Sequence, residues 1–293
     1  MSDSKPRILV QLDSDSQASV FDAVVAIDAG VDHLLRHENV RVEDVRNLVY
    51  GTIFTRGIDH LRSTAIFVGG SDVAAGEALF AEVRRTFFGP MRVSVMLDSN
   101  GANTTAAAAV LAAADHVPLA GATALVLAAT GAVGRRVVLL LAAQGAAVRV
   151  GSRTLGRARS VCDAVAARLP AASLSPHGTA TLQETLAAAQ GAQIVVAAGA
   201  PGAELMSVES RRQSRDLLLA VDLNAVPPVG LEGIDPRDRA AQRDGVMCYG
   251  ALGVGFTKMK IHKAAIQKLF ESNDQVLDVD EVLALARGMK VER

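Results

Sequence analysis

Cysteine is scarce in this chain, and so are aromatic residues and charge of one sign. Its two cysteines, Cys162 and Cys248, lie far apart and outside any CxxC pattern, which excludes a disulfide framework and a thiolate metal cage and fits a reducing cytoplasm. The 293 residues include eight phenylalanines, two tyrosines and no tryptophan, and the net charge is −1. Because basic blocks and stacking side chains are both missing, we expect no nucleic-acid partner.

Long hydrophobic runs are also missing. Residues 1–5 lack the apolar core of a signal peptide, and the most apolar stretch, residues 105–114, is alanine-dominated and too short to span a bilayer. The six histidines follow no metal-ligand spacing, so we expect no metal. We therefore expect a soluble cytoplasmic protein that does not bind membranes. Its length suggests two domains, and half of its residues are hydrophobic, which is ample for their cores.

The most informative pattern runs from Thr123 to Gly134. Residues 123–129 form a short apolar run typical of a strand buried in a parallel sheet, and a helix is expected from Arg135 to about Gln144. Strand, glycine turn and helix in this order predict a dinucleotide site, in which Gly131 admits a pyrophosphate at the helix N-terminus and Gly134 lets the helix pack closely. Ala129 occupies the position of the first glycine, so an ordinary turn is the alternative.

The next strand, residues 147–150, ends in a sequence that favours NADP over NAD. An acidic residue about 20 positions beyond the turn usually binds the ribose 2′-hydroxyl of NAD. This chain instead has the run Gly151-Ser-Arg-Thr154, followed by Arg157 and Arg159. The Arg153 guanidinium suits a dianionic 2′-phosphate, whereas for Arg159 a solvated position at the start of a helix is sufficient.

Two later strands, residues 193–198 and 217–222, end in small or polar residues that can line the nicotinamide half of the cofactor. The strand ends therefore supply a set of cofactor-binding candidates. They are Thr130, Gly131, Ala132, Val133, Gly134, Ser152, Arg153, Arg157, Ala198, Gly199, Asn224 and Ala225.

The first half of the chain reads as a second α/β domain. We expect strands at residues 7–13, 48–54, 63–68 and 93–97, and helices at residues 20–29 and 72–87. Ser19 is a good N-cap for the first helix, and Asp22 then stands at its third position, where a carboxylate favours the helix dipole. This structural role is the alternative to a catalytic one for Asp22.

A polar loop follows the strand at residues 93–97. Polar residues at the carboxyl end of a strand are where open α/β sheets bind ligands, which makes this loop the candidate substrate site. Helix capping by Asn103 or Thr104 is the alternative. The substrate-binding candidates are Asp98, Asn100, Gly101, Asn103 and Thr104.

The C-terminal part contains the remaining candidate. Glycine-rich residues 246–256 lead into a helix expected at residues 257–270, with Lys258 and His262 four apart on one face. A last helix is expected at residues 279–287. The glycines would permit a close approach of backbone to ligand, so that Lys258 can face the cleft.

Several segments match one family from end to end. They are Ser19-Val-Phe-Asp22, Gly51-Thr-Ile-Phe-Thr-Arg56, Ser63-Thr-Ala-Ile-Phe-Val-Gly-Gly70, Met96-Leu-Asp-Ser-Asn-Gly101 with Asn103-Thr-Thr105, Thr130-Gly-Ala-Val-Gly134, Asn224-Ala-Val-Pro-Pro228, Gly250-Ala-Leu-Gly253 and Lys268-Leu-Phe-Glu-Ser272. With them the chain resembles the NADP-dependent methylene-tetrahydromethanopterin/methylene-tetrahydrofolate dehydrogenases of one-carbon metabolism. Ala129 departs from the glycine expected in close relatives.

The resemblance implies an α/β fold of two domains with a cleft between them. The N-terminal pterin-binding domain would span residues 1–117 and be completed by helices in 255–293, and a Rossmann-type NADP-binding domain would span 118–254. It also implies a homo-oligomer, such as a trimer, and roles for three residues. Lys258 matches a lysine near the reacting ring, Asp22 an acidic residue beside the pterin, and Arg153 the arginine at the 2′-phosphate, with Ser152 as its neighbour.

The implied reaction transfers a hydride from the methylene bridge of the pterin C1 carrier to NADP and leaves a delocalised methenyl cation. The protein must hold the two reacting carbons roughly 3–3.5 Å apart. The Asp22 carboxylate would stabilise the cation, and Lys258 would bind a ring nitrogen or carbonyl. Since strand ends converge on one edge of a sheet, we expect Asp22, the loop from Asp98 to Thr105 and Gly131 to face the same cleft.

Three alternatives stay open. The first is an enzyme of the same fold that uses the folate carrier alone or has cyclohydrolase activity as well. The second is a shikimate- or amino-acid-type dehydrogenase, which would need a different polar set at the Asp98–Thr105 loop. The third is a non-catalytic NADP-binding sensor that keeps the glycine turn.

Overall fold

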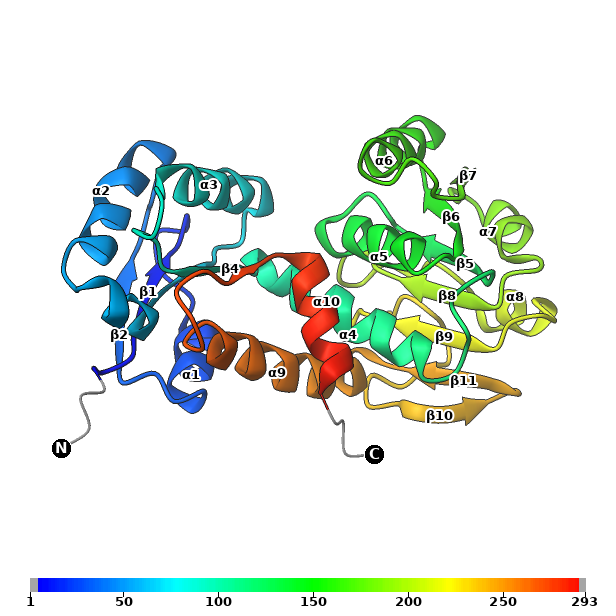
Figure 1. Ribbon diagram of the computed structural model, residues 1–293. Helices are drawn as coiled ribbons and strands as arrows, with labels where there is room; N and C mark the ends of the chain where they lie inside the picture. The colour runs from blue at the N-terminus through cyan, green and yellow to red at the C-terminus, as the bar shows by residue number, and fades with distance from the viewer. Residues whose placement is uncertain (1–4, 290–293) are drawn as a thin grey trace. The chain divides into compact units, whose positions relative to one another are not determined.

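The computed structural model describes residues 5–289, and the chain divides into two compact units (Figure 1). The first unit contains the residues up to Thr104 and from Met259 onward, and the second contains Thr105–Lys258. Helices α4 (Ala102–Ala114) and α9 (Ala251–Lys268) each cross a boundary between the units. The domain limits expected from the sequence, after residues 117 and 254, stay a prediction.

The first unit is built on a five-stranded parallel sheet. Its other elements, in chain order, are β1 (Ile8–Leu12), α1 (Val20–Asp28), β2 (His33–His37), α2 (Val42–Ile53), the 3-10 helix η1 (Ile58–Ser63), β3 (Thr64–Val68), α3 (Val73–Thr86), β4 (Ser94–Leu97), the 3-10 turn η2 (Ser99–Gly101), β12 (Val276–Leu277) and α10 (Val279–Gly288). The strand order is β12-β4-β3-β1-β2, so that the short C-terminal strand β12 pairs with β4 at one edge.

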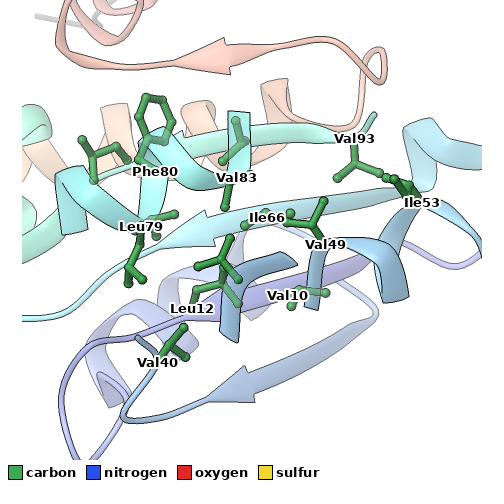
Figure 2. Close-up of a cluster of buried hydrophobic side chains, with 14 of the residues drawn as sticks. Val10, Leu12, Val40, Val49, Ile53, Ile66, Leu79, Phe80, Val83 and Val93 are labelled. Atoms are coloured by element: carbon green, nitrogen blue, oxygen red, sulfur yellow. The ribbon is translucent and has the colours of Figure 1, made fainter. Parts of the chain in front are cut away.

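Alternation along the strands divides the core of the first unit between the two faces of the sheet. Val10 of β1 and Ile66 of β3 point to the face covered by α2 and α3, where Val49 packs against them (Figure 2). Phe67, the next residue of β3, points to the opposite face and stacks on His262 of α9, with ring centroids 5.6 Å apart. The first face is therefore an apolar core, and the opposite face also buries apolar side chains, Leu9, Phe67 and Met96, of which Phe67 packs against the polar His262.

The strand expected at residues 48–54 was wrong, because this stretch belongs to helix α2. Val45, Val49 and Ile53 are fully buried at a spacing of four, which is the stripe by which a helix packs on a sheet. Their β-branched side chains favour strands locally, but packing decides the structure. The second strand is β2, an exposed edge strand whose sequence His-Leu-Leu-Arg-His lacks the alternation that predicts strands.

The helix expected from Thr257 begins earlier, since α9 starts at Ala251. Gly250 and Gly253 lie against the backbone of residues 235–238, and a Cβ at Gly253 would overlap the Asp238 carbonyl oxygen. These two glycines therefore serve packing within the protein, and the close approach to a ligand expected of this glycine-rich stretch does not explain them.

The second unit is a seven-stranded sheet of the doubly wound type. Its other elements are β5 (Thr123–Leu127), α5 (Ala132–Ala143), β6 (Ala147–Ser152), α6 (Leu155–Arg168), β7 (Leu174–Gly178), α7 (Leu182–Ala189), β8 (Ile194–Ala197), α8 (Val208–Gln213), β9 (Leu219–Asp222), β10 (Arg239–Arg243) and β11 (Val246–Tyr249). The order is β10-β11-β9-β8-β5-β6-β7, and only β10 is antiparallel to its neighbour. The predicted α/β fold with a Rossmann-type parallel sheet is confirmed.

The strands of the second sheet place the candidate cofactor residues on one edge. Since β5, β6, β8 and β9 are parallel, their carboxyl ends lie together, and each of these ends carries candidate residues. Helices α5 and α6 pack on β5, β6 and β7 and against each other. Within residues 5–289, no helix has the length and apolar character needed to cross a membrane.

Candidate functional site

The turn between β5 and α5 brings helix and strand into close contact at Gly134. A Cβ at this position would lie 2.8 Å from the Ala129 Cα and 2.9 Å from the Ala128 carbonyl oxygen, so a side chain would force the backbone apart. The left-handed φ of +51° falls on Ala128 rather than on Ala129. Ala129 is fully buried and has no conformational need of glycine, which explains how the turn forms without the first glycine of the pattern.

Gly131 has a different environment from Gly134. It is the exposed N-cap residue of α5, and a Cβ there would find its nearest neighbours, the carbonyl oxygens of Ala128 and Ala198, at 3.8 Å. No side chain caps the helix, so its first N–H groups and positive dipole end are available to an anion. The turn also lies between β5 and β8, where the strand order reverses, which is where dinucleotides bind in this fold. The residues fit a pyrophosphate.

The end of β6 combines one buried hydroxyl and one exposed cation. Ser152 is 5% exposed, and its Oγ accepts a hydrogen bond from the Thr154 N–H at 3.2 Å, which shapes the turn into α6. Arg153 projects at the exposed position between them, and within residues 5–289 no carboxylate forms an ion pair with it. A guanidinium in this state can bind a phosphate without first losing a partner.

The end of β9 is a loop closed by its own polar side chains. Burial raises the pKa of the Asp222 carboxyl, against hydrogen bonds from the backbone of Leu231, Asn224 and Gly230 that lower it, and the net shift is upward. The Asn224 amide donates to the carbonyl oxygens of Val226 and Pro228 and accepts from the Val226 N–H. Because its side chain is used within the loop, Asn224 can contact a cofactor only by displacing these bonds. Ala225 beside it is exposed.

In the first unit, the loop after β4 is organised by Asp98. This carboxylate is 1% exposed and accepts hydrogen bonds from the Thr104 backbone N–H at 3.0 Å and its hydroxyl at 2.7 Å. Asn103 is fully buried and donates to the Leu97 carbonyl oxygen and to Asp278. Helix α4 begins at Ala102, so the capping expected of Asn103 or Thr104 was wrong. Asn100 is the exposed member of the loop, with a left-handed φ of +55° beside Gly101 at +58°.

Asp22 and a second carboxylate, Asp13, flank Gly69 at the carboxyl edge of the same sheet. A Cβ at Gly69 would lie 3.4 Å from Asp13 Oδ2 and 3.6 Å from Asp22 Oδ2. Asp13 is fully buried and accepts hydrogen bonds from the N–H groups of Asp15 and Ser19. Ser19 caps α1 through the Asp22 N–H at 3.2 Å, as predicted, while the half-buried Asp22 carboxylate lies beside the glycine.

His262 joins this group from α9. Its ring is fully buried, stacks on Phe67, lies 6.4 Å from the Phe21 ring, and has Nδ1 3.9 Å from Asp98 Oδ2. The polar groups from β1, α1, β4 and α9 therefore form one cluster at the carboxyl edge of the first sheet. Lys258 lies one helical turn before His262 on α9 and is half-buried.

The comparisons with known proteins agree with this arrangement. The family model of the methylene-tetrahydromethanopterin dehydrogenase N-terminal domain matches residues 20–100. The protein named bifunctional protein MdtA, from Methylorubrum extorquens, is 44% identical over 285 residues, which cover 97% of this chain and 99% of the relative. The chain belongs to the methylene-tetrahydromethanopterin dehydrogenase family.

A further family relative and a solved structure extend this result. The NAD(P)-dependent methylenetetrahydromethanopterin dehydrogenase of the same organism is 29% identical over 95% of this chain and 97% of its own length. The crystal structure of shikimate 5-dehydrogenase from Listeria monocytogenes with shikimate and NAD aligns over 97% of both chains with a TM-score of 0.53 and 12% identity. At this identity the likeness concerns the fold alone.

In this family member, the predicted site residues fall into two groups, one within each unit. Asp22 and Asp98 lie in the polar cluster of the first unit, and the glycine turn and the ends of β6, β8 and β9 lie along the edge of the second sheet. Asp13 was missed, although it stands at the carboxyl end of β1 and the argument used for Asp98 applies to it equally. Arg135, which follows the glycine turn, was also missed.

Proposed function

We propose that this chain oxidises the methylene bridge of methylene-tetrahydromethanopterin to the methenyl form, with NADP as hydride acceptor. The observation that carries the proposal is that the matched family domain, residues 20–100, contains both Asp22 and Asp98 of the polar cluster in the first unit. The NAD(P)-dependent methylenetetrahydromethanopterin dehydrogenase that is 29% identical over 95% of this chain supports the same activity.

The chemistry assigned to the first unit is electrostatic. Removal of a hydride from a carbon between two nitrogens leaves a cation that its own nitrogens delocalise, so the protein needs a nearby negative charge and no general base. Asp98 and Asp13 have their carboxylates engaged by hydrogen bonds within the protein. Asp22 beside Gly69 is half-buried, whereas Asp13 and Asp98 are 0% and 1% exposed, so the Asp22 carboxylate is the one that a carrier can reach.

Lys258 is assigned the role of holding the carrier. A charged ammonium pointed at the reacting carbon would oppose the growing cation, so we propose that it donates a hydrogen bond to a ring nitrogen or carbonyl of the pterin. Asn100, exposed at the tip of its loop, is the second candidate contact.

NADP is proposed on the chain's own residues as well as on its relatives. When bound, its nicotinamide supplies the hydride acceptor. The exposed Gly131 and the uncapped N-terminus of α5 would hold the pyrophosphate, and Arg153 at the end of β6 would hold the 2′-phosphate. Ala198, Gly199 and Ala225 would line the nicotinamide half, with Asn224 keeping its loop in shape.

We also propose a cytoplasmic homo-oligomer. Helix α1 exposes an apolar stripe formed by Val20, Val24 and Ile27, with exposed fractions of 70%, 55% and 55%, and such a stripe favours contact with another chain. Light scattering coupled to size-exclusion chromatography tests this part, and a monomer at micromolar concentration would contradict it.

The deciding experiment compares initial rates on methylene-tetrahydromethanopterin and methylene-tetrahydrofolate, each with NADP and with NAD. We expect turnover of the first carrier with NADP, and Arg153→Ala should raise the NADP Michaelis constant about tenfold, or 1.4 kcal/mol, with little change for NAD. Turnover of the folate carrier alone would favour the second candidate function. Binding of NADPH without turnover of either carrier would sink the proposal and leave a sensor.

A further inference from the structure

A pocket of about 300 Å³ lies between α5 and α6 in the second unit. Its rim is polar, formed by Thr130, Arg135, Arg157 and Ser160, and its floor is the apolar side of α6 around Val161. This volume is at the small end of ligand-binding pockets, so it suits one part of a dinucleotide rather than a whole one.

Two guanidinium groups from different helices line this pocket. Arg135 is held in place by a hydrogen bond from its Nε to the Thr130 carbonyl oxygen at 2.9 Å, while Arg157 comes from the first turn of α6. No carboxylate lines the pocket, and in the described part of the chain neither guanidinium forms an ion pair. Two like charges at one pocket repel each other, and a bound dianion would relieve that repulsion through bidentate hydrogen bonds.

The position of the pocket identifies the anion. Thr130 belongs to the glycine turn, and α6 begins just after Ser152 and Arg153 at the end of β6. In this fold the end of that strand is where the adenosine ribose of a dinucleotide lies. A phosphate on the ribose 2′-oxygen would therefore lie close to the rim of the pocket, whereas a free 2′-hydroxyl would carry no charge to offset.

We infer that the pocket between α5 and α6 is the binding site for the 2′-phosphate of NADP, with Arg135 and Arg157 joining Arg153 as specificity-determining residues. The inference rests on the proposed use of NADP and adds Arg135 of α5 to Arg153 in the turn before α6 and Arg157 in its first turn. Of the two rim hydroxyls, that of Thr130 can donate to a remaining phosphate oxygen, whereas that of Ser160 donates to the Gly156 carbonyl oxygen at 3.1 Å.

The test measures binding of adenosine 2′,5′-bisphosphate and of AMP by titration calorimetry, because these probes differ only in the 2′-phosphate. Arg135→Ala and Arg157→Ala should each weaken the bisphosphate about tenfold and change AMP less than twofold. Arg159→Ala is the matched control, since Arg159 is an exposed arginine on the same helix that does not line the pocket, and it should change neither. Melting curves establish that each variant is folded.

Two results would overturn the inference. One is unchanged bisphosphate binding in Arg135→Ala and Arg157→Ala, and the other is an equal loss for both nucleotides, which would reflect general electrostatics. The outcome is separable from that of the proposed function, because the probes bind without any carrier. Selective loss of bisphosphate affinity in an enzyme that turns over no pterin would keep this site and reject the dehydrogenase activity.

Discussion

The carboxylates at the edge of the first sheet and the arginines at the edge of the second are in opposite states. In the first unit, Asp13 and Asp98 are 0% and 1% exposed and have their oxygens bonded inside the protein. In the second unit, Gly131, Arg153 and Arg157 are exposed, and neither arginine has a carboxylate partner within residues 5–289. Asp13 and Asp98, like the buried Asp222 at the end of β9, belong to networks that the fold itself requires, whereas the glycine turn and the end of β6 offer backbone N–H groups and unpaired cations to a ligand.

This difference teaches that a strand-end position alone does not assign a role. A buried carboxylate that accepts hydrogen bonds from its neighbours pays for its own burial and preorganises the loop around it. An exposed arginine contributes little to stability, so its substitution should change ligand affinity and leave the free energy of unfolding nearly unchanged. Substitutions at the two edges should therefore separate into losses of fold and losses of affinity.

The largest effect is expected for Asp98→Ala. This change leaves the Thr104 N–H without its acceptor, leaves the Thr104 hydroxyl only the Gly101 carbonyl oxygen at 3.3 Å, and removes the carboxylate 3.9 Å from His262 Nδ1, all in a buried region. Stranding buried polar groups in this way should lower the free energy of unfolding by about 3–4 kcal/mol. Urea titration followed by circular dichroism measures it. Asp163→Ala on the exposed face of α6 is the control, and a loss no greater than that of the control would show that the two edges do not differ as argued.

Gly134→Ala and Gly131→Ala contrast fold and binding within one turn. A Cβ at Gly134 meets backbone atoms at 2.8–2.9 Å, and such overpacking costs about 3 kcal/mol. Alanine favours a helix over glycine by about 1 kcal/mol, so the free energy of unfolding should fall by about 2 kcal/mol in Gly134→Ala. At Gly131 the nearest atoms are 3.8 Å away, so stability should be kept while NADPH affinity falls. Melting curves and NADPH fluorescence titration test the pair. Equal melting temperatures for both variants would contradict the contrast.

The sequence predicted the glycine turn of the second unit better than the stretch at residues 48–54 of the first, for a physical reason. A glycine turn between an apolar strand and a helix is a local pattern, and β5, α5 and β6 followed it closely. Residues 48–54 carry a mixed signal, since the same β-branched residues suit a strand and the buried stripe of α2, and only packing on the sheet decides.

The candidate site was predictable in kind but not in detail. Strand ends located Asp98 and Arg153, because carboxyl edges follow from topology. Some of these side chains form all their hydrogen bonds within the protein. The sequence does not show which ones do so, because the partners are distant in sequence, as in the hydrogen bond of Asn103 with Asp278. The pocket that joins Arg135 to Arg157 likewise depends on the packing of two helices, which no local pattern encodes.

Lys258→Ala tests whether a polar residue of α9 serves function without serving the fold. Lys258 is half-buried, in contrast to the fully buried His262 one turn later. We expect turnover or carrier affinity to fall at least tenfold, about 1.4 kcal/mol, with little change in melting temperature. Lys260→Ala, two residues along the same helix, is the control. Wild-type kinetics in Lys258→Ala would show that Lys258 is a solvated lysine of the helix with no role in binding the carrier.

The smallest effect is expected for an ion pair of the second unit, between Arg243 and Asp238. Burial raises the pKa of the Asp238 carboxyl. Hydrogen bonds from Arg243, at 2.5 and 2.7 Å, and from the Asp235 backbone lower the same pKa by more than burial raises it, so the net shift is downward. A carboxyl whose pKa is lowered by folding stabilises the protein above its unfolded value, near 3.9, and loses that contribution as the pH falls through the folded value. Because Arg243 is 37% exposed, solvent screening limits the contribution to about 0.5 kcal/mol.

Arg243→Ala should therefore lower the free energy of unfolding slightly at pH 7 and make that free energy fall less steeply below pH 4, as measured by urea titrations across that range. Arg237→Ala, an exposed arginine outside the pair, should keep the wild-type pH profile, and an identical profile in Arg243→Ala would show that the pair contributes nothing.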